Sequence, residues 1–341
     1  MGLLVTRKRL DELSARDLNA WVDLFPSNAL SSTLFMHPDF CRLVHRIVSP
    51  VEVVVLEDQG RIVGVVPLAR AQGLTGRIRG YGQVAQEISD GFCFPVEDAY
   101  VDTLGSALLK AGVWSIFVTH FTVGRRIPNV NMGAVTKTYA VRSAVGMGNL
   151  WDQLKERSKK FWSDTERCVR RLNEFSGGYQ FHWNSPAPER DLAILIDLKL
   201  EQYRRTNQYK APLFQKDLQE LLKALVMMPT GKFSAPLSVL YCGDKLVAAH
   251  LGLSGGGRLH YWFPVYDPAY SKYSPGKILL SEVMKHSEAQ SVAIIDFGEG
   301  YADYKVAVSN EVRELCKATI SSGVLGAISM LPLRLAWRFG G

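Results

Sequence analysis

The stretch that decides the fold runs from Arg258 to Lys305 and reads RLHYWFPVYDPAYSKYSPGKILLSEVMKHSEAQSVAIIDFGEGYADYK. Its first part, Arg258 to Tyr266, is rich in aromatic and β-branched residues and predicts a strand. The apolar spacing from Lys277 to Ala289 predicts a helix, and Val292 to Phe297 predicts a second strand. The stretch therefore predicts a β-loop-α-β unit whose last strand ends in polar residues, where ligands commonly gather.

The loop before the predicted helix has the features of an anion site. Ser274-Pro275-Gly276 places a proline and a glycine where the helix begins. Unpaired backbone N–H groups and the helix dipole attract anions at such a point, and Lys272 and Lys277 add positive charge. The alternative interpretation is that the Pro-Gly pair simply turns the chain.

The composition indicates a large globular protein, and its net charge favours an anionic partner. The chain has 341 residues, of which 47% are apolar, so it can bury a large core, and the length favours two domains. Forty basic against 33 acidic side chains give a net charge of +7, which suits a phosphorylated cofactor, a nucleic acid or an acidic membrane. The five cysteines are widely spaced and match no metal or disulfide pattern, so we expect a cytoplasmic protein without a metal.

The second half of the chain repeats the first. Aligning Leu56 with Leu240 sets VLEDQGRIVGVVPLA against VLYCGDKLVAAHLGL at one constant offset without a gap. Each hairpin is followed by a helix and a strand, at 99–111 and 113–121 in the first half. We therefore expect two related α/β units in tandem, against the alternative of a chance likeness between common elements. Further helices are predicted at 10–25, 37–48, 193–206 and 216–227.

The two copies differ where the helix begins. The first copy enters its helix through Pro95-Val-Glu-Asp, with Asp102 close behind, and these acids would repel a phosphate. The second enters through Lys-Tyr-Ser-Pro-Gly-Lys, so only the second unit is expected to hold an anionic cofactor. The expected division is 1–145 for the first unit, 146–318 for the second, and 319–341 for an apolar tail.

A basic amphipathic helix is predicted between the units, at 151–175, where basic side chains outnumber acidic ones. Its charges form either a solvated face or a contact with phosphate or nucleic acid. The sequence contains no Walker loop, GxGxxG or HExxH motif, which argues against several common enzyme classes.

Three segments of the second half carry a family resemblance: GDKLVAAHLGL, YDPAYSKYSPGKILL and DFGEGYADYK. They resemble the acetyltransferase domain of the cellulose-biosynthesis (CelD-type, BioF2-like) family, a branch of the GNAT superfamily. LFMHPDF, GRIVGVVPLAR and SDG in the first half resemble the same family. The tandem arrangement is similar to that of Fem-type aminoacyltransferases. The resemblance implies two GNAT-like units, each a central mixed β-sheet flanked by helices.

The resemblance also implies acyl transfer from acetyl-CoA or a longer acyl-CoA to an amine or hydroxyl group. The cofactor would bind at the loop before the helix, where the sequence has Tyr273-Ser-Pro-Gly-Lys in place of the usual Gln/Arg-x-x-Gly-x-Gly/Ala pattern. The cofactor-binding residues expected from this loop are Lys272, Tyr273, Ser274, Gly276 and Lys277.

Attack on a thioester requires a base near the acceptor and an acid for the leaving thiolate. Asp296 and Glu299, at the end of the last strand, are the expected bases, and Tyr304 is the expected donor to the leaving thiolate. Tyr266, at the end of the opposite strand, is a further expected catalytic residue. His250 and His260 are alternative bases, although a histidine in a strand is more often packed in the core. Lys305, His250 and Trp262 are the residues expected to bind the acceptor. The alternative role of Lys305 is an ion pair with Asp296 or Glu299.

Three functions compete at this point. The first is an acyltransferase acting on a small-molecule or lipid-linked sugar for a bacterial surface polysaccharide. The second is a Fem-like transferase using aminoacyl-tRNA, the one case in which nucleic acid is an expected partner. The third is an inert binding protein. The tail, with Trp337, Arg334 and Arg338, suits an anionic membrane surface at the inner face of the cytoplasmic membrane. The alternative is a helix that packs on the protein's own core or on a second subunit.

Overall fold

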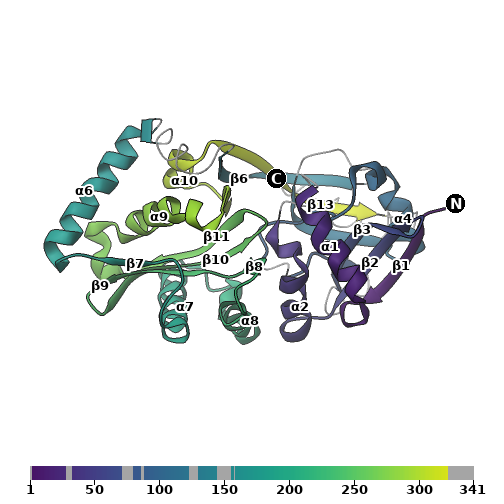
Figure 1. Cartoon of the computed structure of the whole chain (residues 1–341), viewed down its shortest axis with the longest axis horizontal. Coiled ribbons are helices and arrows are strands. Elements are labelled where there is room, and N and C mark those ends of the chain that lie inside the picture. The colour runs from purple at the N-terminus through teal and green to yellow at the C-terminus, as the bar shows by residue number, and fades with distance from the viewer. Residues whose placement is uncertain are drawn as a thin grey trace. The chain divides into compact units, whose positions relative to one another are not determined.

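The computed structural model describes residues 2–27, 33–70, 80–85, 88–122, 130–143, 155–156 and 158–321. The described residues form two compact units, one that includes residues 2–137 and 313–321 and one within residues 138–312. Each has a β-sheet flanked by helices (Figure 1), which confirms the predicted α/β fold class. The predicted boundary after residue 145 lies later in the chain than this division, and residues 313–318, predicted for the second unit, are grouped with the first.

The first unit is built on a sheet in which the strands follow the order β1, β2, β3, β4, β5, β13. Only the β4–β5 pair is parallel. The helices α1 (Ala15–Ser27), α2 (Pro38–Ile47) and α4 (Leu104–Lys110) belong to this unit. The strands are β1 (Leu4–Arg9), β2 (Val51–Asp58), β3 (Arg61–Arg70), β4 (Tyr81–Gly82), β5 (Ser115–Thr122) and β13 (Glu311–Ser321).

The second unit has the strand order β6, β12, β11, β10, β9, β7, with the short β8 paired to β10. Its strands are β7 (Gln180–His182), β8 (Phe233–Ser234), β9 (Leu237–Cys242), β10 (Lys245–Gly255), β11 (Arg258–Tyr266), β12 (Ile294–Glu299) and the second part of β6 (Val130–Arg142), from residue 138 onward. Its helices are α6 (Lys159–Ser176), α7 (Pro188–Arg205), α8 (Lys216–Val226), α9 (Pro275–His286) and α10 (Asp303–Val308). In Figure 1, α9 lies over one face of this sheet and α7 and α8 lie under the other.

The sequence repeat extends to the irregularities of the two hairpins. Asp58 pairs with Arg61 across the first turn, and Cys242 pairs with Lys245 across the second. The ladder of the first hairpin shifts between Leu56 and Glu57, and that of the second shifts between Leu246 and Ala248. The extra residues are Val63 and Val247, which occupy the same place in the sequence alignment. A β-bulge at matching positions supports the tandem interpretation, because bulges are placed features of a sheet.

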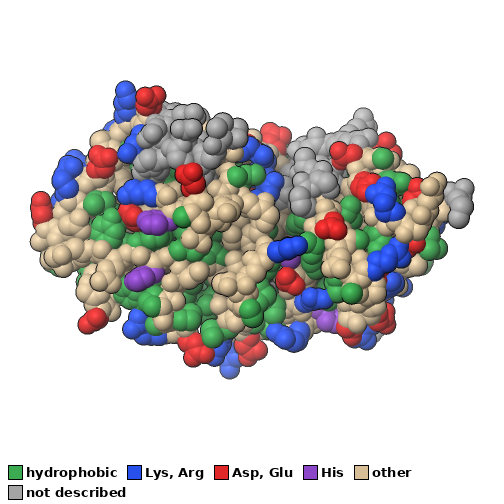
Figure 2. Space-filling model, viewed as in Figure 1, with side chains coloured by type: hydrophobic (Ala, Val, Ile, Leu, Met, Phe, Trp, Pro, Cys, Tyr) green, Lys and Arg blue, Asp and Glu red, His purple; other side chains and the backbone are tan. Residues whose placement is uncertain are grey.

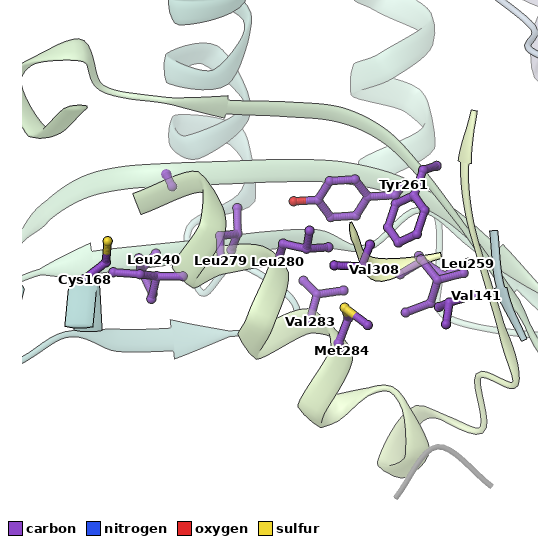
Figure 3. Packing of buried hydrophobic residues seen from close by; sticks show 14 of the residues in the cluster. Val141, Cys168, Leu240, Leu259, Tyr261, Leu279, Leu280, Val283, Met284 and Val308 are labelled. Atoms are coloured by element: carbon purple, nitrogen blue, oxygen red, sulfur yellow. The ribbon is translucent and has the colours of Figure 1, made fainter. Parts of the chain in front are cut away.

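Helix α9 supplies the apolar contacts that hold the second unit together. Ile278, Leu279 and Val283 are fully buried, and they join a cluster that includes residues from β9, β10 and β11. Figure 3 shows Leu279, Leu280, Val283 and Met284 of α9 gathered with Leu240, Leu259, Tyr261 and Val308. A buried side chain of this size stabilises by about 1.5–3 kcal/mol. This packing fixes the first turn of α9 relative to the end of β11.

Most predicted elements appear within a few residues of their expected bounds. The predicted strand at 258–266 is β11, and the helix predicted from Lys277 begins two residues earlier, at Pro275. The basic helix predicted at 151–175 is described from Lys159, as α6. The predicted tail at 319–341 lies outside the described residues beyond Ser321. None of the helices in the described part of the chain is long and apolar enough to cross a membrane.

Candidate active site

The parallel strands β11 and β12 separate partway along their length. They pair from Arg258 opposite Ile294 to His260 opposite Asp296. Beyond that pair β11 continues to Tyr266 and β12 continues to Glu299, and no described strand takes the place of β12 beside β11. A β-bulge at Trp262 accompanies the separation, because Leu251 pairs with Phe263 and Gly252 with Tyr261. The separated strand end is therefore open to a ligand.

A cleft of about 440 Å³ lies at this strand end. It is bounded by β11, by the loop and first turn of α9, by the end of α7 and by Tyr304 of α10. The residues that line it are Lys199, Gln202, Arg205, Tyr261, Pro264, Val265, Tyr266, Ser271, Ser274, Gly276, Lys277, Leu279, Leu280 and Tyr304. Three of the predicted cofactor-binding residues and both predicted catalytic tyrosines are among them.

The first turn of α9 presents its backbone to the cleft. Ser274 adopts the left-handed conformation (φ 53°), and Pro275 occupies the first helical position, where its missing N–H is no loss. The Gly276 N–H has no acceptor among the described residues. A Cβ at Gly276 would meet only the Tyr266 ring, at 3.5 Å, so the space next to this N–H is open. An oxygen of a phosphate could therefore approach the backbone here.

Lys272 and Tyr273 lie beside the cleft and contact α6. The Tyr273 ring is buried and stacks on Phe175, with 4.8 Å between the ring centroids. The Lys272 amino group lies over both rings, at 5.4 Å from Phe175 and 4.9 Å from Tyr273. Lys277, which lines the cleft, places its amino group 5.3 Å from the Phe161 ring. Of the predicted cofactor residues, Ser274, Gly276 and Lys277 line the cleft. Lys272 and Tyr273 do not line it and pack against α6.

Tyr304 brings a protonated hydroxyl group to the cleft. Burial raises its pKa to about 12, so the hydroxyl keeps its proton at neutral pH. Its ring packs edge-on against Phe297 of β12, with 6.4 Å between centroids. Tyr266, at the end of β11, is largely exposed and lines the same cleft. Both tyrosines are therefore available as donors to a ligand.

The predicted carboxylate bases are absent from the lining of the cleft. Asp296 Oδ1 accepts hydrogen bonds of 3.0 Å from the Thr138 hydroxyl of β6 and from the Gly298 N–H. The Glu299 side chain is exposed. The buried Lys305 amino group donates to the carbonyls of Gly298 (3.4 Å) and Glu299 (2.7 Å), so it holds the end of β12 in place. The catalytic roles of the two acids and the acceptor role of Lys305 stay predictions.

The other predicted acceptor residues also lie away from the lining. His250 is fully buried and stacks on Tyr261, with 3.9 Å between centroids. Burial, with a smaller effect from the charge of His260, lowers the pKa of His250 well below its usual value, so this imidazole is neutral. Trp262 packs against Phe263, with 4.5 Å between centroids. In the described part of the chain, no group of three His, Cys, Asp or Glu side chains is arranged to hold a metal ion.

Helix α7 contributes three cleft residues that the sequence analysis missed: Lys199, Gln202 and Arg205. Their i, i+3, i+6 spacing puts them along one face of the helix. The Lys199 amino group donates to the Pro264 carbonyl at 3.1 Å, which links α7 to the separated end of β11. Burial, with a smaller effect from the charge of Lys305, lowers the pKa of Lys199 to about 8.

Comparisons with known proteins agree with this geometry. Residues 159–306 match the family model described as "Acetyltransferase (GNAT) domain". The match lies inside the second unit and includes β11, α9 and β12. This part of the second unit is therefore similar to a GNAT acetyltransferase domain, and all the residues that line the cleft fall within the match. A search of curated protein sequences finds no match to this chain.

Solved structures with the same fold cover nearly the whole chain. FemX matches with a TM-score of 0.65 at 10% identity, over 97% of this chain and 99% of its own. A conserved protein of unknown function from Bacteroides thetaiotaomicron gives 0.56 at 11% identity, over 91% and 98%. The C-terminal domain of a putative lysylphosphatidylglycerol synthetase from Agrobacterium fabrum gives 0.52 at 10% identity, over 94% and 96%. At these identities the likeness shows the fold alone.

The lowered pKa of Lys199 can be measured by titration. We expect its amino group to titrate with a pKa of about 8, against about 10.4 for an ordinary lysine, because burial disfavours its charged form. NMR of ¹³C-methylated lysines would show this titration, and Lys199→Met would assign it by removing the signal. Since the folded-state pKa is the lower one, the folded protein should gain stability relative to Lys199→Met as the pH rises from 8 to 10. A Lys199 signal that titrates near 10.4 would contradict this.

Proposed function

We propose that the second unit is an acyl-CoA-dependent acyltransferase. It would transfer an acetyl or longer acyl group to an amine or hydroxyl of an amino sugar or glycan precursor. The observation that carries the proposal is the cleft where β11 leaves β12, directly in front of the open first turn of α9. The sugar acceptor, small or lipid-linked, and a place in surface polysaccharide synthesis at the inner face of the membrane rest on the resemblance to the CelD-type family.

The chain's own residues fit an acyl-CoA. The Gly276 N–H and the Lys277 amino group suit the pyrophosphate, because both are donors at a helix N-terminus. Val265, Leu279 and Leu280 give the cleft an apolar wall that suits the pantetheine arm and the acyl chain. The bound cofactor would supply the activated thioester. The Tyr304 hydroxyl, which burial keeps protonated at neutral pH, is the group that would give a proton to the departing thiolate.

Cofactor binding can be tested at the start of α9. Gly276→Val should weaken acetyl-CoA binding about 10- to 150-fold, because the added side chain would keep the phosphate away from the backbone N–H. The expected loss is that of one hydrogen bond to a charged group. Lys277→Glu should weaken it about 3- to 30-fold, because it inverts a charge at the helix N-terminus. Isothermal titration calorimetry with acetyl-CoA and longer acyl-CoAs measures both effects.

The matched control is Asp102→Asn, at the corresponding helix entry of the first unit, where acetyl-CoA affinity should not change. Thermal unfolding of each variant checks that the fold is kept; the space around Gly276 admits a Cβ at ordinary contact distance. Unchanged affinity in both Gly276→Val and Lys277→Glu would remove this site from the proposal.

Tyr304 can be tested in turnover. Tyr304→Phe should lower kcat by about 10²- to 10⁴-fold, the usual effect of losing a positioned acid, with little change in acetyl-CoA affinity. The control is Tyr301→Phe, because Tyr301 is 74% exposed and its hydroxyl donates to Asp303. Release of coenzyme A, followed with a thiol reagent, reports both rates. Equal kcat in the two variants would exclude Tyr304 as the acid.

A second candidate is a Fem-like transferase that uses aminoacyl-tRNA, and the basic side of α6 favours it. Figure 2 shows Lys and Arg side chains, with acidic ones among them, over this helix. The exposed basic residues of α6 are Lys159, Lys160, Arg167, Arg170 and Arg171. Such a surface suits a nucleic-acid backbone. Thermal stabilisation by charged tRNA and none by acyl-CoA would favour this candidate over the first.

A further inference from the structure

The α7 side of the cleft carries positive charge that the protein does not neutralise. Lys199 and Arg205 line the cleft together with Lys277, and the lining contains no aspartate or glutamate. Neither Lys199 nor Arg205 has a carboxylate partner in the described part of the chain. A single unpaired charge on a protein surface is common, but here three cationic side chains line the same cleft. An anion in the cleft would face positive charge from both α7 and α9.

Lys199 is the most informative of these cations because it is desolvated. Its amino group makes one hydrogen bond, to the Pro264 carbonyl, and lies 5.4 Å from the Tyr203 ring. Lys199 is partly buried, and a desolvated ammonium group without a counter-charge is destabilising, so burial lowers its pKa to about 8. The protein keeps this unfavourable group in the cleft wall, where a bound anion would neutralise it.

Gln202 places a second requirement on the ligand that binds in the cleft. Its side-chain oxygen Oε1 is buried and has no hydrogen-bond partner among the described residues, although the residue lines the cleft. A buried polar atom left without a partner costs about 1–3 kcal/mol. The ligand that satisfies it must offer an N–H or O–H group. Gln202 lies one helical turn from both Lys199 and Arg205, so this donor group would lie close to the anion.

The α9 side of the same cleft has its own donors, the Gly276 N–H and the Lys277 amino group, which the proposed function assigns to the acyl donor. The α7 side is then left for the acceptor. An acceptor amine or hydroxyl could donate the hydrogen bond that Gln202 Oε1 does not receive from the protein. An anionic group on the same molecule would meet Lys199 and Arg205.

We propose that the acceptor is a small anionic amine or alcohol, whose phosphate or carboxylate group is bound by Lys199 and Arg205 and whose nucleophile is oriented by Gln202. This inference rests on the proposed function, because it assigns the acceptor half of the same cleft. It adds to the proposed function the requirement that the acceptor carry a negative charge.

The test uses pairs of amines that differ in the anionic group. O-phosphoethanolamine is compared with ethanolamine, and β-alanine with n-propylamine, by calorimetric titration into the full chain saturated with coenzyme A. At least one member that carries the phosphate or carboxylate group should bind about tenfold or more tightly than its analogue without that group, as expected for a hydrogen bond to a charged group. The pair that shows the preference distinguishes phosphate from carboxylate. Lys199→Met and Arg205→Gln should each reduce the preference, whereas Lys216→Met, on the exposed side of α8, should leave it unchanged.

Acetyl-CoA affinity, measured on the same samples, separates the two proposals. Wild-type protein that does not bind acetyl-CoA would overturn the proposed function. Wild-type protein that binds acetyl-CoA but binds both members of every pair equally, or binds none, would overturn the anionic acceptor alone. Loss of acetyl-CoA affinity in Lys199→Met as large as in Lys277→Glu would also overturn it, because the α7 cations would then hold the donor.

Discussion

The site depends on the early end of the β11–β12 pairing. Parallel strands normally continue their hydrogen bonds while both are extended, but here the last pair is His260 and Asp296 and both strands run on. The bulge at Trp262 lies just beyond that pair. A Cβ at Gly252, opposite the bulge, would come within 2.8 Å of the His260 carbonyl oxygen, so only glycine lets β10 approach so closely there. Pro264 has no N–H, which leaves one fewer backbone donor to satisfy along the open part of β11.

The proposed acyl-donor site lies in one of two units whose hairpins are alike. The two hairpins share their turn register and their bulge, at Val63 and Val247. Their helix entries differ: the first begins with a 3₁₀ turn at Asp98 preceded by Glu97, which forms an ion pair with Arg61. Acidic groups at a helix start stabilise the helix but repel a phosphate. The first unit therefore has the fold without the electrostatics of a phosphate site.

Sequence patterns were sufficient for the parts of the site that lie close together in the chain. β11, the start of α9 and Tyr304 fall within one stretch, and the proline, glycine and lysine of its loop have direct physical meanings. Lys199, Gln202 and Arg205 could not be placed, because nothing in a helical pattern says which face will meet a strand end more than fifty residues later. Asp296 shows a related limit. Its partner Thr138 belongs to a strand far back in the chain, and that pairing is invisible in local periodicity.

The most direct measurement is amide hydrogen exchange of the full chain with and without acetyl-CoA. The account predicts slower exchange on binding in residues 261–266 of β11 and 276–279 of α9, where the separated strand and the helix start would contact the ligand. Residues 98–110 of the first unit should exchange at the same rate in both states. Protection of 98–110 in place of the second-unit segments, or acetyl-CoA binding that leaves 261–266 and 276–279 unchanged, would contradict the account.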